Sequence, residues 1–276
     1  MLGAILGDIA GSLWEGQQNI PLNRSLIESE SRYTDDSVCT VAVARWLLEG
    51  GDLASHLQDL GRIYIGVGYG HTYRQWLLSD NPKPYGSWGN GAVMRIGPTV
   101  LWAQDNHELQ TLTVESAKPT HNHEEALDVV QKMGLTLRYC FENAHQSKEV
   151  LNQQGSLICQ ENLALLKESH FKNQFLIHCK PTFYAGFWSS IQAQNFQDTI
   201  WKAVSLGGDT DTNGAVAGMF GEALYRIPSF LIEQASLKFY QDDGLWNIMQ
   251  AFYNHPRVIR NLTKWKRTLQ IPDAKV

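Results

Sequence analysis

Two short acidic clusters carry the residues of this chain that are best suited to chemistry. The first is Thr34-Asp35-Asp36-Ser37 and the second, far along the chain, is Asp209-Thr210-Asp211-Thr212. Gathering four carboxylates in one place costs free energy through repulsion and desolvation, unless a cation lies between them. The candidate donors are all oxygens with no adjacent His or Cys, which suits Mg²⁺, Mn²⁺ or Ca²⁺ and disfavours Zn²⁺. The clusters therefore predict a divalent metal pair.

A helix cap is the alternative interpretation of each cluster, because each one precedes an apolar run with helical spacing. Asp, Ser and Thr are favoured at helix starts, where they accept hydrogen bonds from free backbone N–H groups. We expect residues 35–37 at the start of a helix that continues from Val38, and a second helix over residues 213–225. A cap needs one such residue and not three in a row, so two clusters together favour the metal.

A further carboxylate, Glu15, follows an apolar N-terminal run that is rich in small residues. Glycine or alanine occupies positions 3, 4, 7, 10 and 11 of that run, and positions 214, 217, 218 and 221 after the second cluster. A glycine inside a helix costs about 1 kcal/mol relative to alanine, so tight packing must compensate. We expect helices over these two stretches to touch, which would bring Glu15 towards both acidic clusters.

The elements that must position these residues are mostly helices. Apolar residues recur at helical spacing and strand signals are sparse, so the sequence predicts an all-α fold. Further helices are expected over residues 53–64, 126–137, 162–168, 184–192, 196–205 and 229–240, with a terminal helix after Pro256. The segment 138–171 is either a variable flap that faces a target or a surface helical hairpin.

Length and composition indicate one ordered domain. No linker divides the 276 residues, which favours a single domain over 1–276, and 43% hydrophobic with 18% charged residues is typical of globular proteins. No apolar stretch approaches the roughly 20 residues that cross a bilayer, and the N-terminus lacks a signal-peptide pattern. A net charge of −5 gives no overall attraction to nucleic acid. We expect a cytoplasmic monomer with neither nucleic-acid nor membrane partners.

Five motifs follow one another along the chain. They are GDIAGSLWE (7–15), YTDDS (33–37), WGNGAVMRIGP (88–98), THNH (120–123) and GGDTDT (207–212). In combination and order they resemble the ADP-ribosylglycohydrolase family, which includes the dinitrogenase reductase-activating glycohydrolase. The resemblance implies a compact all-α helical bundle with two Mg²⁺ or Mn²⁺ ions. It also implies hydrolysis of the bond between ADP-ribose and a modified target, commonly arginine, with release of ADP-ribose.

The same resemblance assigns roles to residues by matching position. The implied metal ligands are Thr34, Asp35, Asp36, Asp209, Asp211 and Thr212, with Asp211 shared between the two ions. Glu15 matches the family's mobile glutamate near the scissile bond, and either Glu15 or Asp36 would act as general base. Glycine at 214 and the stretch 219–222 depart from the family's usual residues, as does Trp88 where tyrosine is common. These differences touch packing and the ligand-stacking wall, and not the metal ligands.

A glycine-rich loop and a histidine are the implied substrate contacts. The loop would bind the pyrophosphate and adjoining ribose through backbone N–H groups, and an ordinary turn is the alternative. Its residues are Gly86, Ser87, Trp88, Gly89, Asn90 and Gly91. Trp88 would stack on a ligand ring or fill the core. His121 is the better candidate of the two histidines in THNH, although that run also suits a helix cap.

Three functions are compatible with these residues. The first is a hydrolase that acts on an ADP-ribosylated protein or small molecule, with ADP-ribosyl-arginine as the expected linkage. The second is a protein that binds ADP-ribose or a nucleotide without turnover, and the third is a hydrolase of another linkage, to serine, a nucleobase or a small metabolite. The full acidic set with Glu15 favours an enzyme, because a binding protein does not need it.

Overall fold

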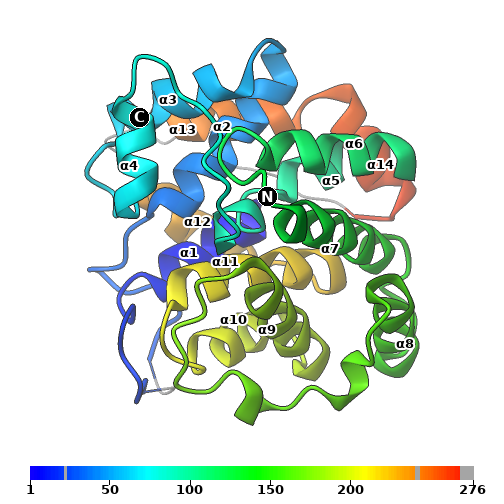
Figure 1. Cartoon of the computed structure of the whole chain (residues 1–276). Coiled ribbons are helices and arrows are strands. Elements are labelled where there is room, and N and C mark those ends of the chain that lie inside the picture. Colours follow the sequence, from blue (N-terminus) through cyan, green and yellow to red (C-terminus); the bar gives the residue numbers. More distant parts are fainter. Residues whose placement is uncertain (22–23, 240–242, 268–276) are drawn as a thin grey trace.

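The computed structural model describes residues 1–21, 24–239 and 243–267. These residues form fourteen α-helices and three short 3₁₀ helices, with no strand among them, which confirms the predicted all-α class (Figure 1). No helix within the described ranges combines the length and apolar character that a bilayer crossing requires.

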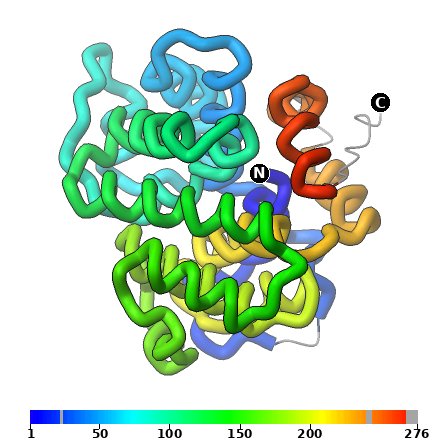
Figure 2. The backbone as a smooth tube through the Cα atoms, turned by 90° about the vertical axis from the view of Figure 1, so that its right-hand side faces the viewer, coloured from blue at the N-terminus to red at the C-terminus, as the bar shows by residue number. Residues whose placement is uncertain are grey.

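Two helices from opposite ends of the sequence lie side by side at the middle of the molecule (Figures 1 and 2). They are α1 (Leu2–Gly11) and α11 (Thr210–Leu224). All of α1 is buried, and so is all of α11 except its last residue. Most residues of both helices are apolar, and a helix with apolar residues on every face is buried inside a protein. The polar exceptions are Asp8 in α1, and residues 210–213 and Glu222 in α11.

Glycines allow this central pair to touch backbone to backbone. A Cβ atom on Gly7 would lie 1.9 Å from the carbonyl oxygen of Gly214, and one on Gly3 would lie 2.1 Å from that of Gly218. No side chain fits in such a space. The predicted contact between the two small-residue stretches is therefore confirmed, and it places the end of α1 beside the start of α11.

The remaining helices surround this pair. In Figure 1, α9 and α10 pack on α11 from below, whereas α2, α3 and α13 lie above. The bounds are α2 (Asp35–Glu49), α3 (Leu53–Ile63), α4 (His71–Leu78), α5 (Gly97–Trp102), α6 (Asn106–Ala117), α7 (Glu124–Glu142), α8 (Lys148–Cys159), α9 (Cys179–Gln192), α10 (Phe196–Val204), α12 (Ser229–Lys238), α13 (Asp243–Tyr253) and α14 (Pro256–Lys264).

One predicted helix is wrong. Residues 162–168 contain no α-helix but a 3₁₀ turn over Leu163–Leu165, and a second one follows at Glu168–His170. Leu163 is the only residue of 162–168 that is buried, and Leu166 is partly buried against the core, so an α-helix there would gain little from packing. Within the segment 138–171, the end of α7 and the whole of α8 follow one another as two helices, which agrees with a helical hairpin, and a flap that faces a target stays a prediction. Helix α14 confirms the predicted terminal helix.

Candidate active site

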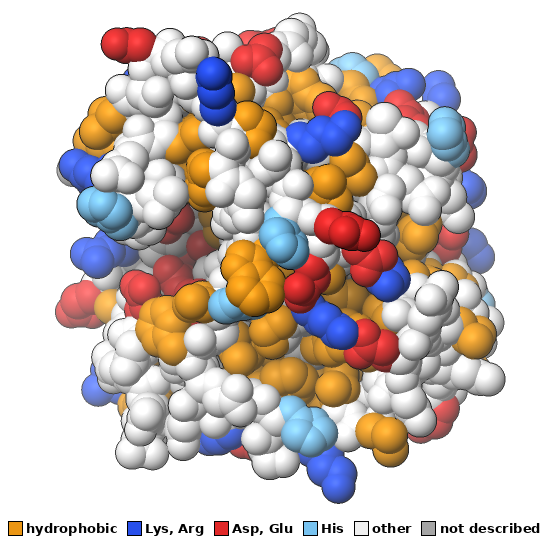
Figure 3. All heavy atoms as spheres, in the orientation of Figure 1, with side chains coloured by type: hydrophobic (Ala, Val, Ile, Leu, Met, Phe, Trp, Pro, Cys, Tyr) orange, Lys and Arg blue, Asp and Glu red, His pale blue; other side chains and the backbone are white. Residues whose placement is uncertain are grey.

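A pocket of about 310 Å³ opens where the starts of α2 and α11 meet the loop after α1. On the face drawn in Figure 3, acidic side chains gather at a hollow left of the centre. The predicted site residues that line the pocket are Glu15, Thr34, Asp35, Asp36, Gly89, Asn90, Gly91, His121, Asp209, Asp211 and Thr212. Gly86, Ser87 and Trp88 are not among the lining residues.

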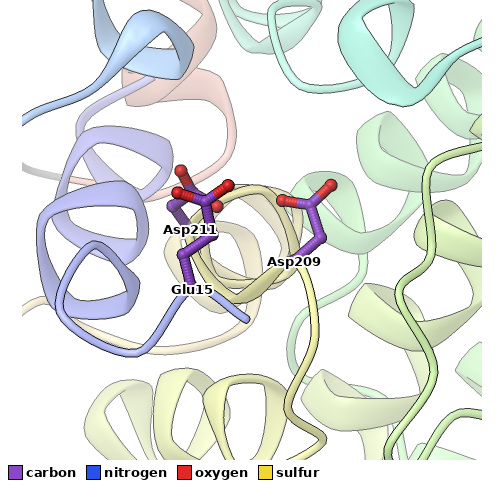
Figure 4. Close-up of side chains that lie close together, drawn as sticks. All are labelled: Glu15, Asp209 and Asp211. Atoms are coloured by element: carbon purple, nitrogen blue, oxygen red, sulfur yellow. The ribbon is translucent and has the colours of Figure 1, made fainter. Parts of the chain in front are cut away.

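The two acidic clusters converge in this pocket. One carboxylate oxygen each from Glu15, Asp209 and Asp211 lies within 4.8 Å of the others, and Figure 4 shows all three side chains at the start of α11. The hydroxyl of Thr212 donates to Asp36 Oδ2 at 3.2 Å, which links α11 to α2. The sequence prediction that these distant segments meet is confirmed.

Helix capping accounts for few of the acidic residues. Thr34 is the N-cap of α2, where its hydroxyl accepts from the N–H of Asp36, so neither Asp35 nor Asp36 is needed as a cap. Asp209 occupies the N-cap position of α11 without a capping hydrogen bond, and it accepts from Asn90 Nδ2 at 2.6 Å instead. The carboxylates at both helix starts are therefore available to a ligand.

Burial and mutual repulsion raise the pKa of every aspartate in this centre. Burial is the largest cause in each case, and the charge of Asp211 is the second cause at Asp35 and Asp36. The pKa of Asp35 rises to about 8, and the pKa values of Asp36 and Asp211 rise well above their ordinary range. Holding these groups ionised at neutral pH is unfavourable unless a positive charge lies between them.

The donor set fits a hard divalent cation. Asp36 Oδ1 is buried and has no hydrogen-bond partner among the described residues. Such an atom costs free energy unless something binds it. Carboxylate and hydroxyl oxygens are the ligands that Mg²⁺ and Mn²⁺ prefer.

Comparison with known proteins agrees with this site. The sequence model of the ADP-ribosylglycohydrolase family matches residues 1–253. The chain belongs to the ADP-ribosylglycohydrolase family. It is 24% identical over 264 residues to the ADP-ribosylarginine hydrolase Tri1 of Pseudomonas putida (strain GB-1), covering 82% of this chain and 70% of that protein. It is 26% identical over 228 residues to the ADP-ribosyl-[dinitrogen reductase] glycohydrolase of Rhodospirillum rubrum, covering 74% of each.

A solved structure shows the same fold. It is described as an ADP-ribosylglycohydrolase-related protein complex and superposes with a TM-score of 0.72 at 24% identity. The match covers 91% of this chain and 94% of that one. The resemblance to the ADP-ribosylglycohydrolase family, and the all-α fold that it implies, are thus both confirmed.

In this protein, backbone N–H groups of the glycine-rich loop already donate hydrogen bonds to other groups of the protein. The N–H groups of Gly86, Ser87, Gly89 and Asn90 donate to Asn122 Oδ1, Thr120 O, Ser87 Oγ and Ile177 O, respectively. They are therefore not free to bind a phosphate in this conformation. The loop instead packs closely against the ring of His121. A Cβ atom on Gly91 would lie 2.9 Å from His121 Cε1, so only glycine fits there without a shift of the ring.

Trp88 and the two histidines occupy different environments. Trp88 is 45% exposed, and its ring meets the ring of His178 edge-on with centroids 4.1 Å apart, so the core-filling interpretation is wrong. His123 is the N-cap of α7, where its Nδ1 accepts from the N–H of Glu125. His121 is buried and lines the pocket. The capping interpretation thus holds for His123, whereas His121 lines the pocket.

Two residues of the site went unrecognised in the sequence. Asp8 is fully buried in α1 and accepts hydrogen bonds from Thr34 and Ser37, including bonds of 2.9 Å from Thr34 N and 3.1 Å from Ser37 N. It therefore ties α1 to the start of α2 and fixes the first acidic cluster. Arg95 is fully buried and lines the pocket. A single charged residue inside an apolar run was the available signal for Asp8.

Proposed function

We propose that this protein is a divalent-metal-dependent hydrolase that cleaves the bond between ADP-ribose and a modified target, with ADP-ribosyl-arginine as the substrate linkage. The observation that carries the proposal is the convergence of Glu15, Asp36, Asp209 and Asp211 in one pocket that also contains His121. The names of the two curated relatives support it, since one is an ADP-ribosylarginine hydrolase and the other removes ADP-ribosyl from dinitrogen reductase.

The proposed cofactor is a pair of Mg²⁺ or Mn²⁺ ions. The residues that would hold them are Thr34, Asp35, Asp36, Asp209, Asp211 and Thr212. Asp211 suits a shared position because it lies close to Glu15 and Asp209, and its charge also raises the pKa of Asp36 on α2. When bound, such ions can orient the hydroxyls of a ribose and lower the pKa of water. Asn90 holds Asp209 in place through its side-chain amide.

Glu15 is the residue best placed to move a proton. It is exposed and lies in the loop after α1, whereas Asp36, Asp209 and Asp211 are buried. A carboxylate on a loop can approach the scissile bond without disturbing the buried ligands. We therefore assign Glu15 as the general base that activates water for attack at the ribose C1 atom. Asp36 then serves mainly as a ligand.

The test is release of ADP-ribose. The protein should be incubated with arginine-, serine- and nucleobase-linked ADP-ribose, each with Mg²⁺, with Mn²⁺ and with a chelator. We expect release from the arginine linkage only when a divalent cation is present. The variant Asp211→Asn, which keeps the shape and removes the charge, should lower kcat at least a hundredfold, which is about 2.7 kcal/mol in activation free energy.

A matched control shows whether the fall in kcat is specific to Asp211 or follows the loss of a carboxylate anywhere in the protein. Asp59 on α3 is exposed and pairs with Arg45 at 3.0 Å, away from the pocket, so Asp59→Asn should leave turnover unchanged. Binding of ADP-ribose without any release would identify a binding protein instead. Release from serine or a nucleobase but not from arginine would correct the linkage. Full activity of Asp211→Asn would refute the metal centre.

A further inference from the structure

Arg95 is a buried cation in the wall of the pocket. Its side chain is fully buried, and no carboxylate pairs with it among the described residues. Its Nε donates to the carbonyl of Ser116 at 3.0 Å, and its Nη2 donates to that of Ala117 at 3.3 Å. These carbonyls end α6, where the negative end of the helix dipole stabilises a positive charge. The guanidinium is thus held in one orientation.

The same guanidinium fixes the hydroxyl of Thr120. Nη2 of Arg95 donates to Thr120 Oγ1 at 2.8 Å, and that oxygen lies 2.7 Å from His121 Nδ1. Arginine can only donate, so Thr120 Oγ1 is an acceptor in the first of these bonds. Thr120 is fully buried, and the one acceptor that the described residues offer to its own proton is His121 Nδ1. The hydroxyl therefore donates to the histidine.

These hydrogen bonds determine which ring nitrogen of His121 carries the proton. A histidine that accepts at Nδ1 carries its proton at Nε2 when it is neutral. Burial, and next the positive charge of Arg95, lower the pKa of His121 well below its usual value, so the ring is neutral at physiological pH. The opposite tautomer would leave the proton of Thr120 buried without an acceptor, which is costly.

The Nε2 atom of His121 faces the glycine-rich loop. Cβ atoms built on Gly89 and Gly91 would lie 3.6 Å and 3.1 Å from it, and both glycines line the pocket. No residue in the described part of the chain accepts a hydrogen bond from Nε2. Since several N–H groups of the loop are already used within the protein, His121 is a fixed donor that remains for a ligand.

We propose that Thr120 is a positioning residue that, together with Arg95, locks His121 in the Nε2–H tautomer, so that this wall of the pocket donates a hydrogen bond to a diphosphate oxygen of ADP-ribose. The choice of ligand rests on the function proposed above. The buried positive charge of Arg95 favours an anionic acceptor over a neutral one. Thr120 itself does not touch the ligand, and its effect passes through His121.

The tautomer can be measured in the ligand-free protein. We expect the ¹⁵N spectrum of histidine-labelled protein at pH 7 to show a pyridine-type Nδ1 and a pyrrole-type Nε2 for His121. The signals of this ring are assigned as those that disappear in His121→Asn. Thr120→Val, which replaces the hydroxyl with a methyl group of similar size, should change these ring shifts. Thr120→Ser, which keeps the hydroxyl, should restore them. A pyrrole-type Nδ1 for His121 in the wild type would overturn the proposal.

Ligand affinity provides the second measurement. Calorimetry should show ADP-ribose binding about tenfold more weakly to Thr120→Val than to the wild type, as expected for loss of one aligned hydrogen bond. The KM should rise by a similar factor while kcat changes little, and Thr120→Ser should behave as the wild type does. Thr113→Val is the matched control, because Thr113 is also fully buried but its hydroxyl bonds only to carbonyls of α6.

The outcomes separate this inference from the proposed function. If the wild type neither binds ADP-ribose nor releases it, the proposed function fails, and the nitrogen shifts of the free protein still decide the tautomer. If ADP-ribose is bound and released but Thr120→Val binds it as the wild type does, the positioning role of Thr120 is wrong. An equal loss of affinity in Thr113→Val would assign the effect to general destabilisation and would also overturn it.

Discussion

Asp8 and Asp36 are both buried carboxylates, but their partners differ. Asp8 accepts from the backbone and hydroxyl groups of Thr34 and Ser37, so its oxygens are satisfied by the protein. Asp36 Oδ1 has no hydrogen-bond partner in the described ranges. A buried oxygen left without a partner is expensive, whereas a satisfied one stabilises the fold. Asp8 therefore holds the structure that positions the site, and Asp36 is available to a ligand.

The hydrogen bonds of Asp8 predict losses of different size for two of its substitutions. Asp8→Ala leaves the N–H groups of Thr34 and Ser37 buried without an acceptor, and it should lower the free energy of unfolding by about 2–4 kcal/mol. Asp8→Asn can keep an oxygen at the Oδ2 position, which accepts from both N–H groups. This variant should therefore lower the free energy of unfolding by less than about 1 kcal/mol. Urea unfolding at pH 7 measures both. Equal losses would show that these hydrogen bonds do not stabilise the start of α2.

At the scale of elements, the site depends on how closely α1 and α11 approach. Glu15 follows α1, and Asp209 and Asp211 begin α11, so the separation of these helices sets the spacing of the three carboxylates. The backbone contact of Gly7 with Gly214 keeps that separation small. The glycines are retained there although alanine would be the better helix former.

Gly7→Ala tests this contact. The added Cβ would lie 1.9 Å from a backbone oxygen that cannot turn aside, so the helices must separate. We expect a loss of about 3 kcal/mol or more in the free energy of unfolding, by overpacking in a tight core, together with weaker Mn²⁺ binding by calorimetry. Gly66→Ala is the control for stability, because a Cβ there meets nothing within 4 Å and should change stability little. Equal stability of the two variants would contradict the role of the contact.

The sequence predicted this pair of helices because small residues repeat along both, and it predicted the metal centre because carboxylates cluster at helix starts. It did not identify the hydrogen-bond partners of single buried side chains. Nothing near Asp8 indicates that it accepts from Thr34 and Ser37, and nothing near Arg95 indicates Thr120. The expected helix over 162–168 is replaced by a 3₁₀ turn, in which Leu163 is buried, Leu166 is partly buried against the core and Leu165 is exposed. Local periodicity predicts a helix only where tertiary packing rewards it.

At the scale of the whole molecule, one hydrophobic cluster extends from Met1 to Trp265 and includes residues of both central helices. We propose on this ground that the chain folds as one domain. A single core means that the acidic site and the fold share their stability, since α1, α2 and α11 all contribute to both. The monomeric state and the cytoplasmic location stay predictions.

Coupling between the site and the fold predicts how stability depends on pH. In the metal-free protein, the pKa values of Asp8 and Asp35 rise to about 7 and about 8, chiefly through burial and next through the charge of Asp211. Both groups have an ordinary value near 4 in the unfolded chain. The folded state therefore binds more protons between pH 4 and 8, so the contribution of these groups to stability is complete at low pH and is lost as pH rises.

A divalent cation should remove this penalty, because it neutralises the carboxylates that would otherwise repel one another. We expect saturating Mn²⁺ to raise Tm by about 5 °C or more at pH 8 and by much less at pH 5, since protons compete for the same oxygens at low pH. Taking the difference with and without Mn²⁺ at each pH cancels the titration of groups outside the site. In Asp211→Asn the rise in Tm caused by Mn²⁺ should be small at both pH values. A gain that is the same at pH 5 and pH 8 would show that the cation binds elsewhere, and that the buried aspartates are not its ligands.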